Sequence, residues 1–264
     1  MKTKPLDCLV IITCTLISCI AISGAAPVPY LEDFESYALG DTPVDNFTEV
    51  DSTTWTIVAP SFSGQAYQNE ISVFSPGPGF VAAENSSAVV NFHRLSTSGF
   101  LIVTSFVIDE LILDGADPSN TANIGLVARA ADSMPASSGG DRYQVSYFLD
   151  DDDLGHPTGK LYLTEHNLFF GDSLNALSTG ALPVTIGDIY MLTLEGRISG
   201  SSLLLRARLT DITTAMSISV SATDTANILG GSFFGYFNNV RVKDGGTVTI
   251  NADFDDFSAR RRTL

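Results

Sequence analysis

The residues with the clearest capacity for chemistry are three aspartates close to the C-terminal end of the sequence. Asp253, Asp255 and Asp256 occur beside Phe254 and Phe257 in the segment ADFDDFSA. Carboxylates at this spacing can bind a hard cation, act as catalytic acids and bases, or lie on the solvated side of a strand. The neighbouring sequence provides evidence for choosing among these three roles.

That sequence reads as a strand with one irregularity. Alternate residues form a buried file, which comprises Val248, Ile250, Ala252 and Phe254. Because neighbouring strand residues face opposite sides, we expect Asp253 and Asp255 to point to solvent. Phe257 follows Phe254 by three positions, which strict alternation cannot place on the same face. A β-bulge is therefore expected near Asp255 and Asp256.

Carboxylates elsewhere in the chain do not have a recognisable catalytic spacing. The segment VIDELILD holds Asp109, Glu110 and Asp114, which differs from the Glu-x-Asp-x-x-Glu strand motif of some polysaccharide-cleaving sandwiches. The sequence has no His-Glu-x-x-His and no Gly-x-Ser-x-Gly motif, and its three histidines are scattered. This pattern favours a non-catalytic protein, with a glycoside hydrolase as the weaker alternative.

Aromatic side chains on two consecutive expected strands offer a binding surface instead. Tyr143 and Tyr147 share one face of the first strand, while Tyr162 and His166 share one face of the second. Sugars stack their C–H faces on flat rings and need directed hydrogen bonds for their hydroxyls, so these four residues are the candidate ligand-binding site. The alternative is that Tyr143 and Tyr147 are core residues whose hydroxyls bond within the protein.

The elements that must position these residues are strands throughout. Apolar residues alternate with period two between clusters of turn-forming residues, as in 142–149, 160–167, 202–211, 215–222 and 246–254. In 215–222 the expected buried file comprises Met216, Ile218 and Val220. The segment 100–113 is apolar enough to be buried on both faces. Many close strands without helical crossovers predict an all-β antiparallel sandwich or jelly roll.

The N-terminal segment reads as an export signal. Lysines precede an apolar run, and small residues close it, so we expect residues 1–25 to be removed and residues 26–259 to form one domain. All three cysteines, Cys8, Cys14 and Cys19, lie in this segment, so the mature chain has no thiol for disulfides or zinc. Lipid anchoring of a bacterial protein at Cys19 is the minor alternative to plain secretion.

The charge balance limits the partners. The full chain carries a net charge of −16, and loss of Lys2, Lys4 and Asp7 with the signal makes it −17. Nucleic acids and anionic membranes are disfavoured, because phosphate binding needs clustered Lys and Arg. The only basic run in the sequence, Arg260 to Arg262, lies in residues 260–264, which we expect to form a frayed tail.

Several segments together resemble a known family. They are YLEDFESYALGDTP, IGLVARAAD, DRYQVSYFL, GKLYLTEHN, GGSFFGYFNNVRV and the closing ADFDDFSA, in this order over nearly all of the mature chain. They are similar to the LamG-like, concanavalin A-like jelly-roll domains of exported bacterial proteins. The resemblance implies two curved antiparallel sheets, adjacent first and last strands, and often glycan binding with a structural calcium.

This resemblance sharpens the question about the aspartates. If the terminal strands pair, Asp33 and Glu35 from the first would crowd against Asp255 from the last, and calcium would relieve their repulsion. Asp33, Glu35 and Asp255 are therefore the candidate calcium ligands. We expect a secreted or cell-surface, non-catalytic carbohydrate-binding module whose partner is a glycan or extracellular polysaccharide. The alternative is a structural or adhesive surface protein without a small-molecule site.

Overall fold

A computed structural model describes most of the chain beyond the expected export signal. The described residues are 26, 28–41, 47–50, 55–59, 64–79, 81–114, 120–131, 140–150, 158–166, 174–226 and 228–262. The expected signal, with Cys19, lies outside them. Among the described residues, no helix is long and apolar enough to cross a membrane.

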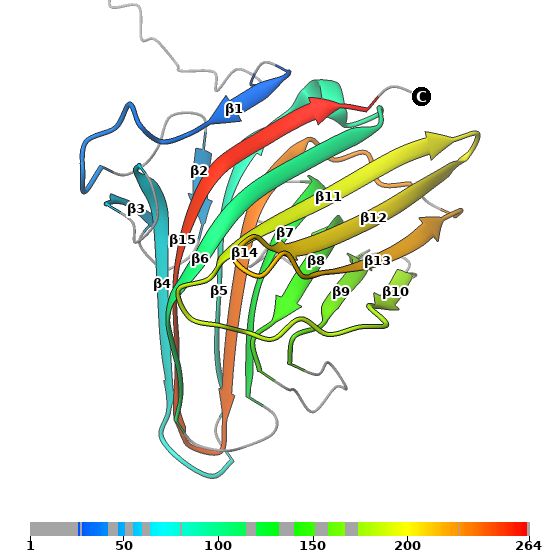
Figure 1. Cartoon of the computed structure of the whole chain (residues 1–264). Helices are drawn as coiled ribbons and strands as arrows, with labels where there is room; N and C mark the ends of the chain where they lie inside the picture. The colour runs from blue at the N-terminus through cyan, green and yellow to red at the C-terminus, as the bar shows by residue number, and fades with distance from the viewer. Residues whose placement is uncertain are drawn as a thin grey trace, which may run out of the picture.

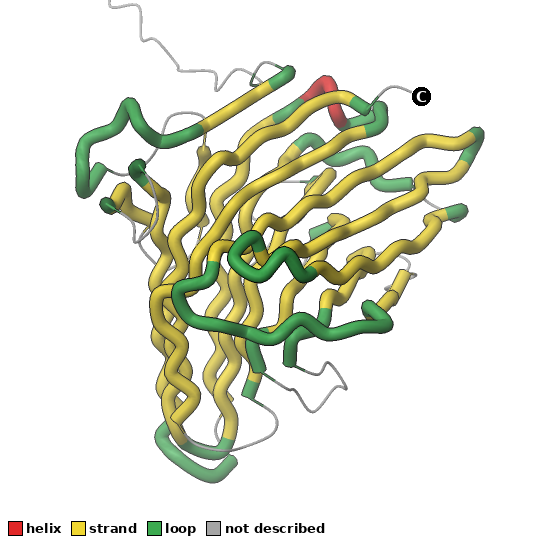
Figure 2. Tube along the Cα trace, viewed as in Figure 1, coloured by secondary structure: helices red, strands yellow, loops and turns green. Residues whose placement is uncertain are grey.

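The described strands form two antiparallel sheets packed face to face (Figure 1). The eight-stranded sheet has the order β13 (Ser217–Asp224), β12 (Ser202–Asp211), β11 (Ile189–Ser199), β6 (Phe100–Asp114), β15 (Gly246–Arg261), β4 (Ala66–Ser75) and β3 (Trp55–Val58), with β1 (Tyr30–Glu32) also paired to β15. The seven-stranded sheet has the order β10 (Leu174–Leu177), β9 (Leu161–His166), β8 (Arg142–Phe148), β7 (Thr121–Ala130), β14 (Phe233–Lys243), β5 (Val81–Asn91) and β2 (Phe47–Val50). In the described part of the chain, one short 3₁₀ helix, His93–Leu95, lies in the connection between β5 and β6 (Figure 2). The prediction of an all-β antiparallel sandwich is confirmed.

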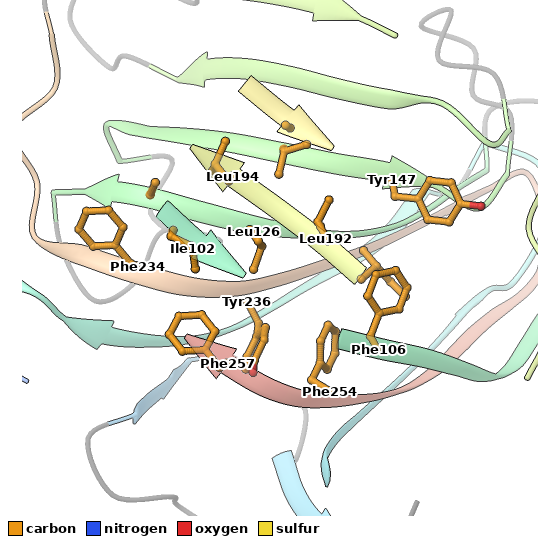
Figure 3. Close-up of a cluster of buried hydrophobic side chains, with 14 of the residues drawn as sticks. Ile102, Phe106, Leu126, Tyr147, Leu192, Leu194, Phe234, Tyr236, Phe254 and Phe257 are labelled. Atoms are coloured by element: carbon orange, nitrogen blue, oxygen red, sulfur yellow. The ribbon is translucent and has the colours of Figure 1, made fainter. Parts of the chain in front are cut away.

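The core lies between the sheets and is rich in aromatic rings (Figure 3). Tyr236 from one sheet and Phe254 from the other have ring centroids 4.5 Å apart, and Phe257 meets Tyr236 edge-on at 5.1 Å. Trp55 is fully buried, and its indole nitrogen donates to Ser86 Oγ at 2.8 Å. Each large apolar side chain buried in this way contributes about 1.5–3 kcal/mol, so a chain without disulfides can hold itself together by burial.

The closing strand has the bulge that the spacing of its phenylalanines predicts. Phe254 and Phe257 are both fully buried, and the pairing of β15 with β6 shifts register between Asp255 and Ser258. Asp256 takes a φ of 52°, a left-handed conformation that lets one extra residue fit. On its other side, β15 pairs with β4 up to Phe254 and with β1 from Phe257 onward. The bulge thus lies where β15 changes its partner, and the expected pairing of first and last strands is confirmed.

Three expectations about strand surroundings are corrected. Strand β6 is not buried on both faces over its whole length, since Ile112 and Leu113 at its far end are each 41% exposed. Met216 precedes β13 and is half exposed, because the buried file begins at Ile218. Strand β15 continues to Arg261, and the Arg262 amide donates to the Gly99 carbonyl at 2.9 Å. Backbone hydrogen bonds therefore hold Arg260 to Arg262 in place at the end of the sheet, whereas their composition alone predicted a frayed tail.

Candidate functional site

Tyr143 and Tyr147 lie on the inner face of β8 and are fully buried. The Tyr143 hydroxyl donates to the carboxylate of Asp224 and accepts from the Leu229 amide at 3.0 Å. The Tyr147 hydroxyl donates to the Leu182 carbonyl at 3.1 Å, and its ring is among the core side chains of Figure 3. Burial raises the pKa of both phenols, and the Asp224 bond raises that of Tyr143 further. These two residues are therefore core tyrosines with satisfied hydroxyls, and they present no face to a surface ligand.

Tyr162 and His166 occupy the opposite, outer face of the same sheet. The β8–β9 register pairs Tyr162 with Ser146 and His166 with Arg142, whereas Tyr143 pairs with Glu165. Both candidate side chains are partly exposed. The structure thus separates the four residues that the sequence grouped, because a pattern within one strand does not say which face its neighbour shares.

Hydrogen bonds hold the outer residues of β9 and β10 in place. The Tyr162 hydroxyl donates to Asn175 Oδ1 at 2.7 Å, and Thr164 Oγ1 lies 3.2 Å from His166 Nε2. The ring of Tyr162 also lies 6.2 Å from that of Phe148. This arrangement combines a fixed aromatic ring with amide, hydroxyl and imidazole groups, which is the chemistry that a sugar needs.

The neighbouring strand β8 carries a row of polar side chains on the same face, and these are at most 7% exposed. Arg142 Nε donates to Gln144 Oε1 at 3.0 Å, and Gln144 Nε2 donates to Ser146 Oγ at 2.9 Å. Sequence reasoning missed these residues because it assigned importance to the tyrosines between them. The two-residue alternation in the sequence could have identified them, because Arg142, Gln144 and Ser146 occupy the face of β8 opposite Tyr143 and Tyr147.

A second polar row crosses the outer face from β7 to β5. Asn123 Nδ2 donates to Asn239 Oδ1 at 3.2 Å, and Asn239 Nδ2 donates to Asn85 Oδ1. The register places these three amides opposite one another on adjacent strands. The outer face of the seven-stranded sheet is therefore polar well beyond β9, the strand that carries both Tyr162 and His166.

The expectation that Asp253 faces solvent is wrong. Asp253 is only 1% exposed, and Gln68 Nε2 donates to its Oδ1 at 2.8 Å. A second register shift, between Asn251 and Ala252, passes over Asp109 of β6, whose carboxyl group shares a hydrogen bond with Asp253. Burial and a hydrogen bond shared with Asp109 raise the pKa of Asp253 to about 7. Strand alternation predicted the face correctly, but neighbouring side chains cover this face.

Asp255 is likewise buried rather than solvated, with 7% of its surface exposed. Its Oδ1 accepts from the Asp256 amide at 2.7 Å, at the bulge. Burial raises the pKa of Asp255 to about 6, helped by the negative charges of Asp256, Glu35 and Asp33. The acidic residues that follow β1 thus influence Asp255 of β15 electrostatically, as expected from the pairing of these two strands.

Asp33 and Glu35, the other two candidate calcium ligands, are exposed and point their oxygens at backbone amides. Asp33 Oδ1 accepts from the Glu35 amide at 3.3 Å, and Glu35 Oε1 accepts from the Gln65 amide at 2.7 Å. Among the described residues, no three carboxylate, histidine or cysteine side chains lie close enough together to hold a metal ion. The donor set formed by Asp33, Glu35 and Asp255 therefore does not fit a calcium site as it stands.

The pair of Asp109 and Asp253 does not have the geometry of a glycosidase. Retaining and inverting enzymes separate their two carboxyl groups by about 5–9.5 Å, so that a sugar or water fits between them. Here the two side chains share a hydrogen bond directly, and Asp253 is buried. This pair offers no room for substrate.

Comparison with known proteins gives likenesses in structure but none in sequence. No protein-family model matches the chain, and no curated protein matches its sequence. Solved structures similar to it include peanut lectin (11% identity, 89% of this chain and 99% of that one, TM-score 0.49) and a basic winged bean lectin with Tn-antigen (10%, 89% and 99%, 0.47). Arcelin-5, a lectin-like defense protein from Phaseolus vulgaris, is similar at 11% identity over 89% of this chain and 100% of that one, with a TM-score of 0.48.

Proposed function

We propose that this protein is an exported, non-catalytic carbohydrate-binding module that uses the outer face of its seven-stranded sheet. The observation that carries the proposal is the partly exposed Tyr162, whose hydroxyl is fixed by Asn175 beside the Thr164–His166 pair. A ring whose orientation is favoured by a hydrogen bond loses less conformational entropy when a sugar stacks on it than a free ring does. The adjacent amide, hydroxyl and imidazole groups can then pair with the sugar hydroxyls.

The finer parts of the proposal rest on the sequence. The export signal at residues 1–25 supports secretion to the bacterial exterior or cell surface, and the order of the family-like segments supports a LamG-like domain. The spacing of the carboxylates supports binding without hydrolysis. Calcium stays a prediction that the placement of Asp33, Glu35 and Asp255 does not favour.

The proposal is tested by a glycan array probed with the purified protein and with Tyr162→Ala. We expect binding to at least one glycan, and we expect the alanine variant to weaken it by roughly tenfold, as for a ring at the centre of an interface. Tyr162→Phe keeps the ring and removes the bond to Asn175, so it should retain much of the affinity.

Phe74→Ala is the matched control, because Phe74 is an exposed ring (64%) on the other sheet. It should leave glycan binding unchanged. Absence of binding to every glycan would refute the proposal and favour the structural or adhesive alternative. Equal losses in the Tyr162 and Phe74 variants would move the site away from β9.

A further inference from the structure

Arginines gather on the outer face of the eight-stranded sheet, over β11 and β12. Arg206 and Arg208 are exposed on the same face of β12, about 7 Å apart along the strand. The register places Glu195 opposite Arg206 and Thr193 opposite Arg208. Within the described part of the chain, neither arginine has a carboxylate partner, and Arg208 donates only to Ser217 Oγ at 3.1 Å.

These arginines line a groove rather than a flat surface. A hollow of about 370 Å³ lies over Thr193, Arg206 and Arg208, and a smaller one of about 110 Å³ continues it past Glu195 to Arg197. At the end of the sandwich, a cavity of about 660 Å³ shares Arg197 and is bordered by Arg261 and Arg262. The three hollows follow one another along β11 and β12, with lining residues shared between neighbours. These strands lie at one side of the sheet in Figure 1.

The charge of this groove opposes that of the molecule. Five arginines border it against a single carboxylate, Glu195, whereas the chain as a whole has 14 basic and 30 acidic residues. Glu195 accepts from both Arg197 and Arg262. Burial alone would raise the pKa of Glu195, but these two arginines outweigh that effect and lower it. Acidic residues elsewhere are screened beyond about 8 Å at physiological salt, so an anion in the groove meets mainly the arginines.

Hydroxyls also lie along the groove, together with the apolar side chains of Met191 and Leu204. Thr193 and Thr210 lie within it, and β13 beside it presents the exposed residues Ser217, Ser219 and Ser221 on the same face. Residues 189–224, all described, place no aromatic ring on this outer face. Single-stranded nucleic acid needs such rings for stacking, so hydroxyls next to guanidinium groups fit an acidic sugar better.

We propose that the groove over β11 and β12 binds an acidic polysaccharide through carboxylate or sulfate groups. Each guanidinium offers a planar pair of donors that matches either anion, and the neighbouring hydroxyls meet the sugar ring. The choice of a polysaccharide among polyanions rests on the proposed carbohydrate-binding function. The groove itself is a second site, on the opposite sheet from Tyr162.

The test measures binding of the purified protein to polygalacturonate, dextran sulfate, uncharged dextran and duplex DNA, at low and at physiological salt. We expect the protein to bind polygalacturonate, dextran sulfate or both, and we expect added salt to weaken this binding. Any binding of uncharged dextran should not depend on Arg206 and Arg208. Arg206→Ala/Arg208→Ala should weaken binding of the acidic polymers by roughly tenfold, and Arg206→Lys/Arg208→Lys by less, because lysine keeps the charge but not the fork. The relative affinity for the two polymers identifies the anion.

Arg241→Ala/Lys243→Ala is the matched control, since it removes two positive charges from the other sheet. It should leave the affinity for the acidic polymers within about twofold. Failure of both acidic polymers to bind, tighter binding to DNA, or an equal loss in the control would overturn the groove proposal. If Tyr162 carries glycan binding while the Arg206/Arg208 variant changes nothing, only this inference fails. If the acidic polymers bind and Tyr162→Ala has no effect on any glycan, only the site proposed on β9 fails.

Discussion

The outer face of the eight-stranded sheet has an acidic half, in which two aspartates are buried, and a basic half, in which two arginines are exposed. In the acidic half, over β15, β4 and β6, Asp253 and Asp255 are buried beside other carboxylates, and their pKa values are raised to about 7 and about 6. In the basic half, over β11 and β12, Arg206 and Arg208 remain exposed. Burial therefore favours the protonated forms of these two carboxyl groups in the acidic half, while the two arginines of the basic half remain in water.

This difference in burial indicates which half of the sheet can bind a charged ligand. A buried carboxylate without a cation reduces its cost by taking up a proton, and it then serves the packing of the fold. An exposed arginine pays no such cost and stays available to an anion. In this protein the exposed arginines, rather than the cluster of buried aspartates, are therefore the charges available to a ligand.

The largest expected effect is a loss of stability as the pH rises. Asp253 has a folded pKa of about 7 against about 3.8 when unfolded, so its contribution is complete below the unfolded value and is lost as pH rises through 7. Between pH 5.5 and pH 8 the free energy of unfolding should fall by about 2 kcal/mol, or roughly 4–8 °C in the midpoint. Thermal unfolding at a series of pH values measures this change.

Asp253→Asn should flatten this pH dependence and raise the midpoint at pH 8, because the amide cannot ionise. Asp114→Asn, at the exposed end of β6, should leave the dependence as it is. An unchanged slope in Asp253→Asn would show that Asp109 and Asp253 do not share the proton, and the contrast between the two halves would be lost.

Calcium binding to the acidic half would contradict this comparison. Because Asp33, Glu35 and Asp255 do not converge, we expect millimolar calcium to leave the unfolding midpoint in place relative to EDTA. Calcium at 100 times its dissociation constant would instead add about 2.7 kcal/mol. A rise of several degrees that Asp255→Ala abolishes would restore the calcium site.

The smallest expected effect on stability comes from Glu195→Gln in the basic half. The ion pairs of Glu195 with Arg197 and Arg262 lie near the surface, where such pairs contribute about 0–1 kcal/mol. Removing the carboxylate also frees both arginines for an anion, so the affinity for polygalacturonate or dextran sulfate should rise by roughly twofold to threefold. Glu70→Gln, on the exposed face of β4, is the control and should change neither quantity.

Local pattern in the sequence was enough to predict the strands, the sandwich and the bulge. The two-residue alternation identified the buried files of β12 and β15, and the interval between Phe254 and Phe257 required an extra residue at Asp255 and Asp256. These features follow from the geometry of one strand, which places alternate side chains on opposite faces whatever lies beside it.

Only the tertiary structure decided which faces are buried and which residues meet. Tyr143 and Tyr162 lie on adjacent strands, yet the β8–β9 register sends one into the core and the other to the surface. Burial of Asp253 depends on Gln68 and Asp109, which come from β4 and β6. The arginine groove joins β12 to the end of β15, about 55 residues later in the chain. Such neighbours are set by strand order and register, and these depend on the packing of the whole sandwich rather than on any one strand.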